Sequence, residues 1–528
     1  MRTFATLLVV GVTTLSLHAG DDGLAGNWKV MLLEDHQLAN PWLIRVKNMG
    51  GKWTAEPEAL KGMAETKLTD FKIAGDLIQF QLQVTLRGGV ATLQFEGRIP
   101  RVGAKKILGS ITANDRSMPA YLEATPAKNG FELDRELLTR SPNDPRVFGA
   151  VVDLIGGAKE KKISTKEVQE WLDTVLRNAE GYGPRFQQDY TKRLIEALAG
   201  EQEYAALAEK LLPKDSPAVQ LNFLATYGSA LKKAGKSQQL KDIEPRIEKL
   251  ELPAFAEYAK TALGFTPAKF AGRKGKSDRA VLIELFTGAM CPPCVAADLA
   301  FDAVEKAFPA KDVVLLQYHL HVPGPDALTN SDCEKRGEFY GRTLRGTPTI
   351  YFNGKADKNV QGGGERGDAE EKYKEYREAL ASMLEKPAGV QLEAKAVRQG
   401  DKIAIQASVK DLARPGEATR LRLVLVEDWV RYKSRNGMLY HHRVVRALPG
   451  GAAGLALTKA NVDHAVTVDL GELRTSLNKY LDDFAKNEAP FPDAERPMRL
   501  RNLHVVAFVQ HDDSYEVLQA VDVAVTEE

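Results

Sequence analysis

The chain has 528 residues, of which 44% are hydrophobic, and its 72 Lys and Arg balance its 71 Asp and Glu. This balance excludes a strongly basic nucleic-acid-binding protein and gives no reason to expect an anionic membrane as a partner. The length predicts three or four domains, and with only three cysteines those domains must depend on hydrophobic cores rather than on disulfides.

Residues 1–19 are typical of a cleaved secretory signal peptide. Arg2 supplies a positive start, residues 4–17 form an apolar stretch, and Ala19 is a small residue before the acidic GDDG. A buried N-terminal helix is the alternative, but the threonines and the abrupt polar end fit export better. No later apolar run is long enough to span a bilayer. We therefore expect a periplasmic or secreted location, where a disulfide can persist.

Residues 24–125 predict a β domain, either a small barrel or a sandwich. Hydrophobic and polar side chains alternate along one stretch, with the hydrophobic ones at Ile78, Phe80, Leu82, Val84 and Leu86. Gly88 and Gly89 then predict a turn, after which Leu93 and Phe95 resume the alternation. This pattern predicts an antiparallel hairpin.

Residues 126–263 change to a helical period. Four prolines recur at comparable intervals, and we expect each to begin a helix because a proline in the first turn costs no hydrogen bond. They are Pro145, Pro184, Pro217 and Pro253. The spacing resembles a tetratricopeptide-like array of helical hairpins, with an irregular helical domain as the alternative. Either arrangement suits spacing or protein contact better than chemistry.

Residues 266–386 carry the chemical motif. Residues 280–286, AVLIELF, predict a buried strand, and a helix is expected from Cys291 onward. A second apolar strand follows at residues 313–318, so the order is strand, helix, strand, as in a parallel crossover unit. Farther along come RGTPTIYFNG, a glycine cluster and a charged helix near residues 369–384.

A strand leading into Cys-Pro-Pro-Cys, then Gly-Thr-Pro-Thr, a further strand, Asn-Gly and a last helix together resemble the thioredoxin superfamily over about a quarter of the chain. The lead-in ELFT also resembles a group of secreted thioredoxin-like proteins. The resemblance implies that Cys291 attacks, that Cys294 resolves, and that the two form a disulfide. It implies that Pro348 is a cis-proline facing them, and that Glu284 replaces the buried acid beneath the site, although it lies one residue farther upstream.

Two further residues are expected to contact substrate. Thr347, directly before Pro348, is expected to line the substrate groove, although extended backbone before a proline is its simpler role. Met290 stands where the family commonly has tryptophan before the first cysteine.

The two central prolines affect the expected chemistry. Cys291 lies at the start of a helix, where the dipole favours a thiolate, and Cys294 follows nearly one turn later. Because Pro292 and Pro293 have no N–H, the amide of Cys294 is the main donor expected near the Cys291 sulfur. We therefore expect a thiol pKa that is less depressed than in a donor-rich motif, and a more reducing pair.

Three further roles for the cysteine pair stay open. As half of a zinc or copper site, the pair needs further ligands, and His319 and His321 are the nearest candidates. As a staple, so small a ring adds little stability. A thioredoxin fold that keeps the cysteines without catalysis is the main competitor. Cys333 is expected to be a buried small residue or, alternatively, a third redox partner. We expect no metal and no cofactor.

Residues 387–528 return to a period of two and predict a β-sandwich with a helical insertion near residues 470–486. Asn436 and Gly437 predict a hairpin turn. His441 and His442 follow it, and since neighbouring side chains on a strand point to opposite faces, we expect them to be exposed or interfacial rather than a shared metal site.

The sequence as a whole predicts a multidomain α+β protein. The expected function is exported thiol–disulfide oxidoreductase, acting on protein disulfides and served by a redox partner protein. The alternative is a secreted binding or scaffold protein that retains the fold, with metal delivery as a further possibility.

Overall fold

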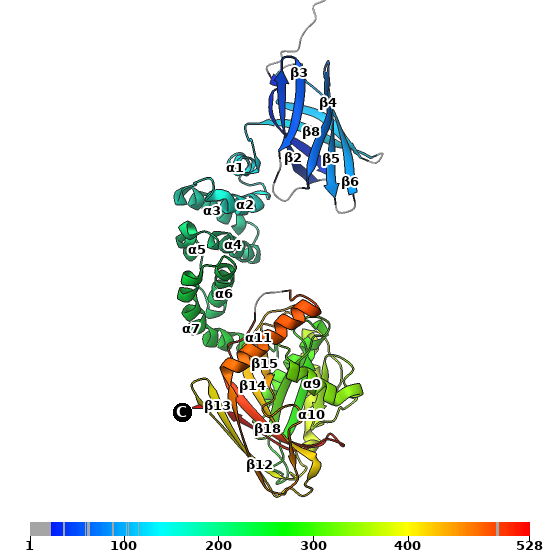
Figure 1. Ribbon diagram of the computed structural model, residues 1–528, viewed down its shortest axis with the longest axis vertical. Coiled ribbons are helices and arrows are strands. Elements are labelled where there is room, and N and C mark those ends of the chain that lie inside the picture. Colours follow the sequence, from blue (N-terminus) through cyan, green and yellow to red (C-terminus); the bar gives the residue numbers. More distant parts are fainter. Residues whose placement is uncertain are drawn as a thin grey trace, which may run out of the picture. The chain divides into compact units, whose positions relative to one another are not determined.

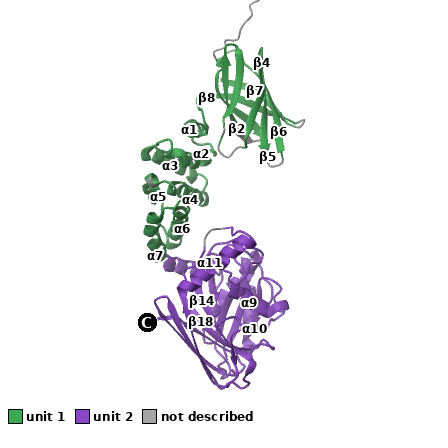
Figure 2. Ribbon diagram, viewed as in Figure 1, with its two compact units in different colours: residues 1–248 green, residues 249–528 purple. Residues whose placement is uncertain are grey.

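The computed structural model describes residues 23–528, apart from 35–36, 59, 61–63, 87–88, 102, 104, 114–115 and 493–495. The expected signal peptide at residues 1–19 lies outside the described residues. The chain forms two compact units, residues 1–248 and 249–528 (Figure 2). Within the described part, no helix is long and apolar enough to cross a membrane.

The first unit contains an eight-stranded antiparallel sheet in the order β3-β2-β1-β8-β7-β6-β5-β4. Its strands are β1 (Gly26–Glu34), β2 (Gln37–Met49), β3 (Lys52–Glu58), β4 (Thr66–Ala74), β5 (Leu77–Leu86), β6 (Gly89–Arg98), β7 (Lys106–Ala113) and β8 (Arg116–Thr125). The end strands β3 and β4 approach each other, so the sheet nearly closes into a barrel (Figure 1). Trp28, Phe80 and Phe95 lie in its core. The predicted hairpin is confirmed, since Leu86 pairs with Gly89.

Helices fill the rest of the first unit, and α7 continues into the second. They are α1 (Gly130–Arg140), α2 (Val147–Ala158), α3 (Thr165–Glu180), α4 (Pro184–Ala199), α5 (Ala205–Lys210), α6 (Pro217–Lys233) and α7 (Ser237–Thr261). Pro184 and Pro217 begin helices as predicted, and α2 begins two residues after Pro145. The prediction for Pro253 is wrong because it lies inside α7. The apolar period continues on both sides of it, through buried Ile247 and Ala254.

The second unit is built on a mixed sheet whose main strands run in the order β11-β9-β10-β15-β14-β18-β19. The strands are β9 (Val281–Thr287), β10 (Val313–His319), β11 (Thr349–Phe352), β14 (Gly416–Arg431), β15 (Tyr440–Ala447), β18 (Leu503–His511) and β19 (Val517–Ala524); β16 (Leu455–Leu457) pairs with β14. β9 and β10 are parallel, as the strand–helix–strand pattern predicts, and β11 is antiparallel to β9.

The domain boundary expected at residue 387 does not separate two sheets. β10 pairs in parallel with β15 at Gln317 and Val444, so strands from both expected domains belong to one sheet. The physical reason is that this pairing joins segments more than a hundred residues apart. Local periodicity predicts each strand correctly but carries no information about such a partner.

Helices cover the β9–β10 part of this sheet on both faces. α8 (Val295–Ala307) and α10 (Ala369–Met383) share one core with Ile283 and Leu285 of β9. α9 (Ser331–Tyr340) contributes to the opposite core, with Leu282 and Phe286. Alternate residues of β9 therefore face different helices, which decides where each side chain near the cysteines points.

A second sheet, in the order β17-β13-β12-β20, faces β14 and β18 across a shared core. Its strands are β12 (Gln391–Gln399), β13 (Lys402–Lys410), β17 (Val462–Asp469) and β20 (Thr526–Glu527). The predicted helical insertion is confirmed as α11 (Leu470–Asn487). The predicted turn at Asn436 and Gly437 joins β14 to β15, with Gly437 at a φ of 76°.

Candidate functional site

The two cysteines lie where β9 passes into α8. After a short loop, Cys291 caps a 3₁₀ turn, Pro292–Cys294, which continues directly into α8. The sulfurs of Cys291 and Cys294 are bonded, with an S–S distance of 2.08 Å. The loop passes close to the next strand connection: a Cβ at Gly288 would lie 2.6 Å from the carbonyl oxygen of Val322, so the position requires glycine.

The backbone amides at the start of the helix have partners other than sulfur. The amide of Cys294 donates to the carbonyl of Cys291 at 3.1 Å. The Val295 amide donates to Pro292, and the Ala296 amide to Gly364. The expectation that Cys294 supplies the main donor to the Cys291 sulfur is therefore wrong. A tight 3₁₀ turn uses that amide for its own hydrogen bond.

Pro348 and Thr347 lie against the disulfide. The peptide bond between them is cis, and the carbonyl oxygen of Thr347 is 3.7 Å from the sulfur of Cys291. The Thr347 hydroxyl donates to the carbonyl of Val322 at 3.3 Å. Four of the expected site residues, Cys291, Cys294, Thr347 and Pro348, thus come together at the carboxyl end of β9.

The glycine cluster at residues 362–364 packs on the cysteine turn, and we name it the glycine strap. The Gly364 amide donates to the carbonyl of Pro293 at 2.7 Å. At Gly363 a Cβ would meet the same carbonyl oxygen at 1.8 Å and Pro348 at 2.9 Å. Backbone approach this close requires glycine. The glycine cluster is visible in the sequence, but nothing there indicates that it packs on the cysteine turn.

The disulfide is almost enclosed. Cys291 is 2% exposed and Cys294 is fully buried, whereas Pro292 and Pro293 between them are exposed. Val322, at the neighbouring loop, is 39% exposed. Of the two cysteines, Cys291 is therefore the one that keeps some exposed surface.

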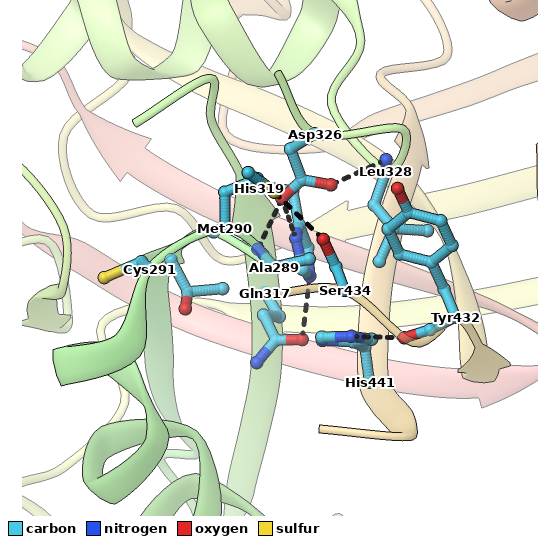
Figure 3. A network of polar contacts seen from close by, with 12 residues as sticks. Ala289, Met290, Cys291, Gln317, His319, Asp326, Leu328, Tyr432, Ser434 and His441 are labelled. Atoms are coloured by element: carbon cyan, nitrogen blue, oxygen red, sulfur yellow. Dashed lines mark hydrogen bonds and ion pairs between the residues drawn. The ribbon is translucent and has the colours of Figure 1, made fainter. Parts of the chain in front are cut away.

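Met290 faces the β14–β15 hairpin. Its sulfur accepts a hydrogen bond from the Ser434 hydroxyl at 3.0 Å (Figure 3). The backbone N–H of Asn436 donates to the carbonyl of Ala289 at 3.0 Å. The C-terminal hairpin thus forms part of the wall beside the cysteines. This contribution has no local sequence signal, because the Asn-Gly turn marks the hairpin but not its contact with Met290.

Glu284 does not lie beneath the cysteine pair, and that expectation needs correction. It is fully buried on the α9 face of β9, where Arg336 binds both carboxylate oxygens at 2.7 and 2.9 Å. The Tyr340 hydroxyl donates to the same carboxylate. Leu285 and Ile283, by contrast, face α8. Because strand side chains alternate, Glu284 points away from the helix that carries Cys294.

On the α8 side, Asp298 is a buried acid one helical turn after Cys294. It is 1% exposed and accepts hydrogen bonds from the hydroxyl of Thr287 at 2.7 Å and the amide of Gln317 at 3.2 Å. Burial raises the pKa of Asp298 well above its usual value, and the nearby carboxylates of Asp302 and Asp326 add to the effect. The only sequence signal is an acid four residues after Cys294, one helical turn along.

The two metal-ligand candidates have partners within the fold. His319 contacts Asp326 and Gln317, whereas His321 accepts from the Asp326 amide and contacts the Tyr480 hydroxyl at 3.1 Å. Burial lowers the pKa of His321 to about 4. Among the residues that the structure describes, no group of three or more His, Cys, Asp or Glu side chains is arranged to hold a metal.

Cys333 is buried, and its thiol lies 3.7 Å from the carbonyl oxygen of Val445. Burial raises the pKa of the Cys333 thiol to about 12, so it is a poor nucleophile. His441 and His442 are also buried, so of the two expected positions, exposed or interfacial, the exposed one is wrong. His442 is interfacial, since its ring contacts Asp302 and Glu305 of α8. The ring of His441 packs edge-on against His319, with the ring centroids 5.0 Å apart.

Comparisons with known proteins provide no further evidence about this site. No family model matches the chain, and no curated protein matches it. Among solved structures, HBP35 of Porphyromonas gingivalis is similar over 48% of this chain and 78% of its own, with 13% identity and a TM-score of 0.33. A similarity this low carries no argument about fold or function.

Proposed function

We propose that the protein is an exported thiol–disulfide oxidoreductase that acts on protein disulfides through Cys291 and Cys294. One observation carries this proposal: a Cys-x-x-Cys disulfide at the start of a helix, with a cis-proline turn in contact with the first sulfur. The β9–α8–β10 crossover and the antiparallel β11 support a thioredoxin-like arrangement around it.

The reaction that this site would carry out has two exchanges. In the first, the Cys291 thiolate attacks one sulfur of a substrate disulfide, and the other substrate sulfur leaves as a thiolate. In the second, the Cys294 thiolate attacks the Cys291 sulfur of that mixed disulfide and releases the remaining substrate sulfur. A redox partner protein then returns the pair to its starting state, and the partner's potential sets the direction.

The remaining parts of the chain suit recruitment. The near-barrel and the helices of the first unit, which we propose to be tetratricopeptide-like, would contact substrate or the redox partner. A periplasmic or secreted location, with residues 1–19 removed as a signal peptide, would let the disulfide persist.

The test is exchange with a fluorescent peptide disulfide, using purified full-length protein. Wild type should exchange, Cys291→Ser should not, and Cys294→Ser should accumulate a mixed disulfide detectable by mass. Cys333→Ala is the matched control and should behave as wild type, since Cys333 is buried and takes no part in the disulfide. Equal inactivity of all four proteins would overturn the proposal.

A second candidate is a binding or scaffold protein in which the disulfide is structural. The enclosure of both sulfurs favours it, because Cys291 is 2% exposed and Cys294 is fully buried. This candidate predicts that the disulfide stays intact in the presence of peptide thiols and that wild type and Cys291→Ser bind partners equally.

A further inference from the structure

The hairpin that joins β14 to β15 is fixed against the loop that leads into Cys291. The Ser434 hydroxyl donates to the sulfur of Met290 at 3.0 Å (Figure 3). The backbone N–H of Asn436 donates to the carbonyl of Ala289 at 3.0 Å. Because Met290 directly precedes Cys291, the end of the hairpin is held beside the disulfide.

Two positively charged side chains flank the serine that makes this contact. Lys433 and Arg435 are both exposed, and neither forms an ion pair with a residue that the structure describes. Neighbouring Cα atoms lie about 3.8 Å apart, so each of the two begins one residue from the contact between Ser434 and Met290. Their charges are therefore available to a molecule that approaches Cys291 from the hairpin side.

A third positive charge belongs to the cis-proline turn. Arg345 is exposed and has no ion-pair partner within the described part of the chain. It precedes Thr347 by two residues, and the carbonyl oxygen of Thr347 is 3.7 Å from the Cys291 sulfur. Two residues of extended chain span at most about 7 Å, so Arg345 also begins close to the disulfide.

The exposed acidic residues near the pair belong to the segment that follows the glycine strap. Glu365 and Asp368 each accept the backbone N–H of the other, at the start of the turn that leads into α10, and Arg366 lies between them. The helix start offsets part of their charge. In contrast, residues 342–348 and 431–438 contain basic side chains and no acidic one. The cis-proline turn and the hairpin are therefore cationic, and the strap side has one excess negative charge.

The surface next to Cys291 itself is apolar. Its exposed residues are Pro292 and Pro293 of the cysteine turn and Val322 and Pro323 of the neighbouring loop. None of them carries a charge, and apolar surroundings strengthen the electrostatic interactions of nearby charged groups. A polypeptide segment that presents its sulfur to Cys291 would thus rest on apolar side chains, with its flanking residues close to the cations.

We propose that the site selects substrate disulfides that lie among acidic residues, with Lys433 and Arg435 on one side of Cys291 and Arg345 on another attracting the carboxylates. The inference rests on the proposed exchange function and names its substrate class, an acidic polypeptide segment. Charges around a site act mainly on the rate of encounter, because they attract a partner before contact is made. The selection is therefore expected in rates and should weaken with salt.

The test uses the full-length Cys294→Ser variant, in which Cys291 is the reactive thiol because Cys333 is buried. The probes are synthetic peptides whose single cysteine is activated as a mixed disulfide with thiopyridine and is flanked by glutamates, glutamines or lysines. The Cys291 thiolate attacks the peptide sulfur, the peptide–thiopyridine S–S bond breaks, and its electron pair leaves with thiopyridine. The absorbance of released thiopyridine gives the rate.

The glutamate peptide should react about tenfold faster than the lysine peptide at low ionic strength, with the glutamine peptide between them. Tenfold is the lower end of the acceleration that a surface of one charge sign produces. In 1 M salt, where the Debye length is about 3 Å, the three rates should converge.

Charge reversal identifies the residues responsible. Arg435→Glu changes the combined charge of the three cations from +3 to +1, so the glutamate-to-lysine rate ratio should fall from about tenfold to about twofold. Adding Lys433→Glu and Arg345→Glu should reverse the preference. The glutamine peptide is the internal control, because altered folding or altered Cys291 reactivity changes its rate as well.

Lys459→Glu is the matched control variant, since it makes the same change in net charge elsewhere. Lys459 is exposed on the loop before β17 and has no ion-pair partner among the described residues. This variant should keep the wild-type rate ratio. A ratio that falls as far in Lys459→Glu as in Arg435→Glu would overturn the assignment to the rim of the site.

The outcomes distinguish this inference from the proposed function. Equal rates for the three peptides, or a preference for glutamate that persists in the triple variant, overturn the charge selection and leave the oxidoreductase proposal intact. Absence of reaction with every peptide overturns both. A preference that depends on salt and reverses with the three substitutions supports an acidic substrate class.

Discussion

Gly363 controls how closely the glycine strap packs on the cysteine turn. A Cβ there would overlap the Pro293 carbonyl oxygen at 1.8 Å, so Gly363→Ala must displace the strap. We expect a loss of about 1–3 kcal/mol in the free energy of unfolding, as for other overpacked sites, and faster reduction of the disulfide by dithiothreitol. Gly367→Ala is the control because a Cβ at Gly367 meets nothing within 4 Å. Equal reduction rates for the two variants would show that the strap does not limit access.

The two prolines between the cysteines determine which amides can reach the Cys291 sulfur. A capping side chain accepts from the second or third residue of its turn, which here are Pro293 and Cys294. Pro293 has no N–H, and the Cys294 amide is used by the Cys291 carbonyl.

Restoring the missing donor should acidify the thiol. We expect Pro293→Ala to lower the pKa of Cys291 by about 1 unit, because a new N–H can bond to the thiolate. The measurement is the rate of alkylation of reduced protein against pH, in a Cys294→Ser background so that only one of the pair reacts. Pro292→Ala, at the first position of the turn, should have the smaller effect. A larger shift from Pro292→Ala would contradict the assignment of Pro293 as the missing donor.

Residues of the site differ in how far the sequence could reveal them. Cys291, Cys294 and Pro348 belong to short motifs whose order along the chain is informative by itself. Glu284 is not the acid beneath the cysteine pair because a buried strand has two apolar faces. The amino-acid sequence of such a strand does not indicate which face packs against α8. His319 stands out in the sequence, but its partner Asp326 lies in the loop between β10 and α9, and loop geometry sets such a contact rather than periodicity.

Among the elements, α8 is tied to β15 by a cluster of charged side chains in which His442 and Asp302 are buried and Glu305 is partly exposed. Nδ1 of His442 lies 3.0 Å from Glu305, and Nε2 lies 3.8 Å from Asp302. Burial opposes a charged ring, but the carboxylates of Asp302 and Glu305 outweigh it and raise the pKa of His442 to about 9, from an ordinary value of 6.5. The helix that carries the cysteines is thus held to the C-terminal hairpin by a protonated histidine.

This clamp predicts a pH-dependent stability. Because the folded pKa of His442 lies above its unfolded value, the stabilisation is complete below about pH 6.5 and is lost as the pH rises through 9. A shift of this size corresponds to about 3 kcal/mol. Burial raises the pKa of Asp302 to about 6, so the titration of Asp302 is centred below the pH range in which His442 loses its proton.

Chemical denaturation between pH 6.5 and pH 9.5 measures the effect. Wild type should lose about 3 kcal/mol of unfolding free energy across this range, and His442→Gln should lose much less. His464→Gln, on β17 of the other sheet, is the control and should keep the wild-type dependence. The clamp is refuted if wild type and His442→Gln show the same slope.

Elements with a strong local pattern were predictable, and their partners were not. The β5–β6 hairpin, the helix starts at Pro184 and Pro217, and α11 all follow from period, turn or cap signals within a few residues. The helix start predicted at Pro253 is wrong because a proline marks a helix start only when the apolar period stops before it. The pairing of β10 with β15 had no local signal at all.

At the scale of the whole molecule, the second unit behaves as one body because its core crosses the expected domain boundary. Val314, Leu316 and Tyr318 of β10 share a buried cluster with Val445 of β15 and Phe508 of β18. Every one of these side chains is at most 1% exposed. Cutting the chain between the two expected domains would therefore uncover both halves of a continuous core.

We predict that a fragment of residues 266–386, the expected thioredoxin-like domain, does not fold alone, whereas residues 249–528 do. Each large apolar side chain left exposed costs about 1.5–3 kcal/mol, so several together exceed the stability of about 5–15 kcal/mol available to a typical domain. Circular dichroism during heating distinguishes the two fragments: the longer should unfold in one cooperative transition, and the shorter should show none. Fragment 266–528, which lacks the stacking of Phe255 on Trp429 at 4.5 Å, should fold with a lower Tm. A cooperative transition in fragment 266–386 would mean that the cysteine site is an independent module, with the shared sheet only an attachment.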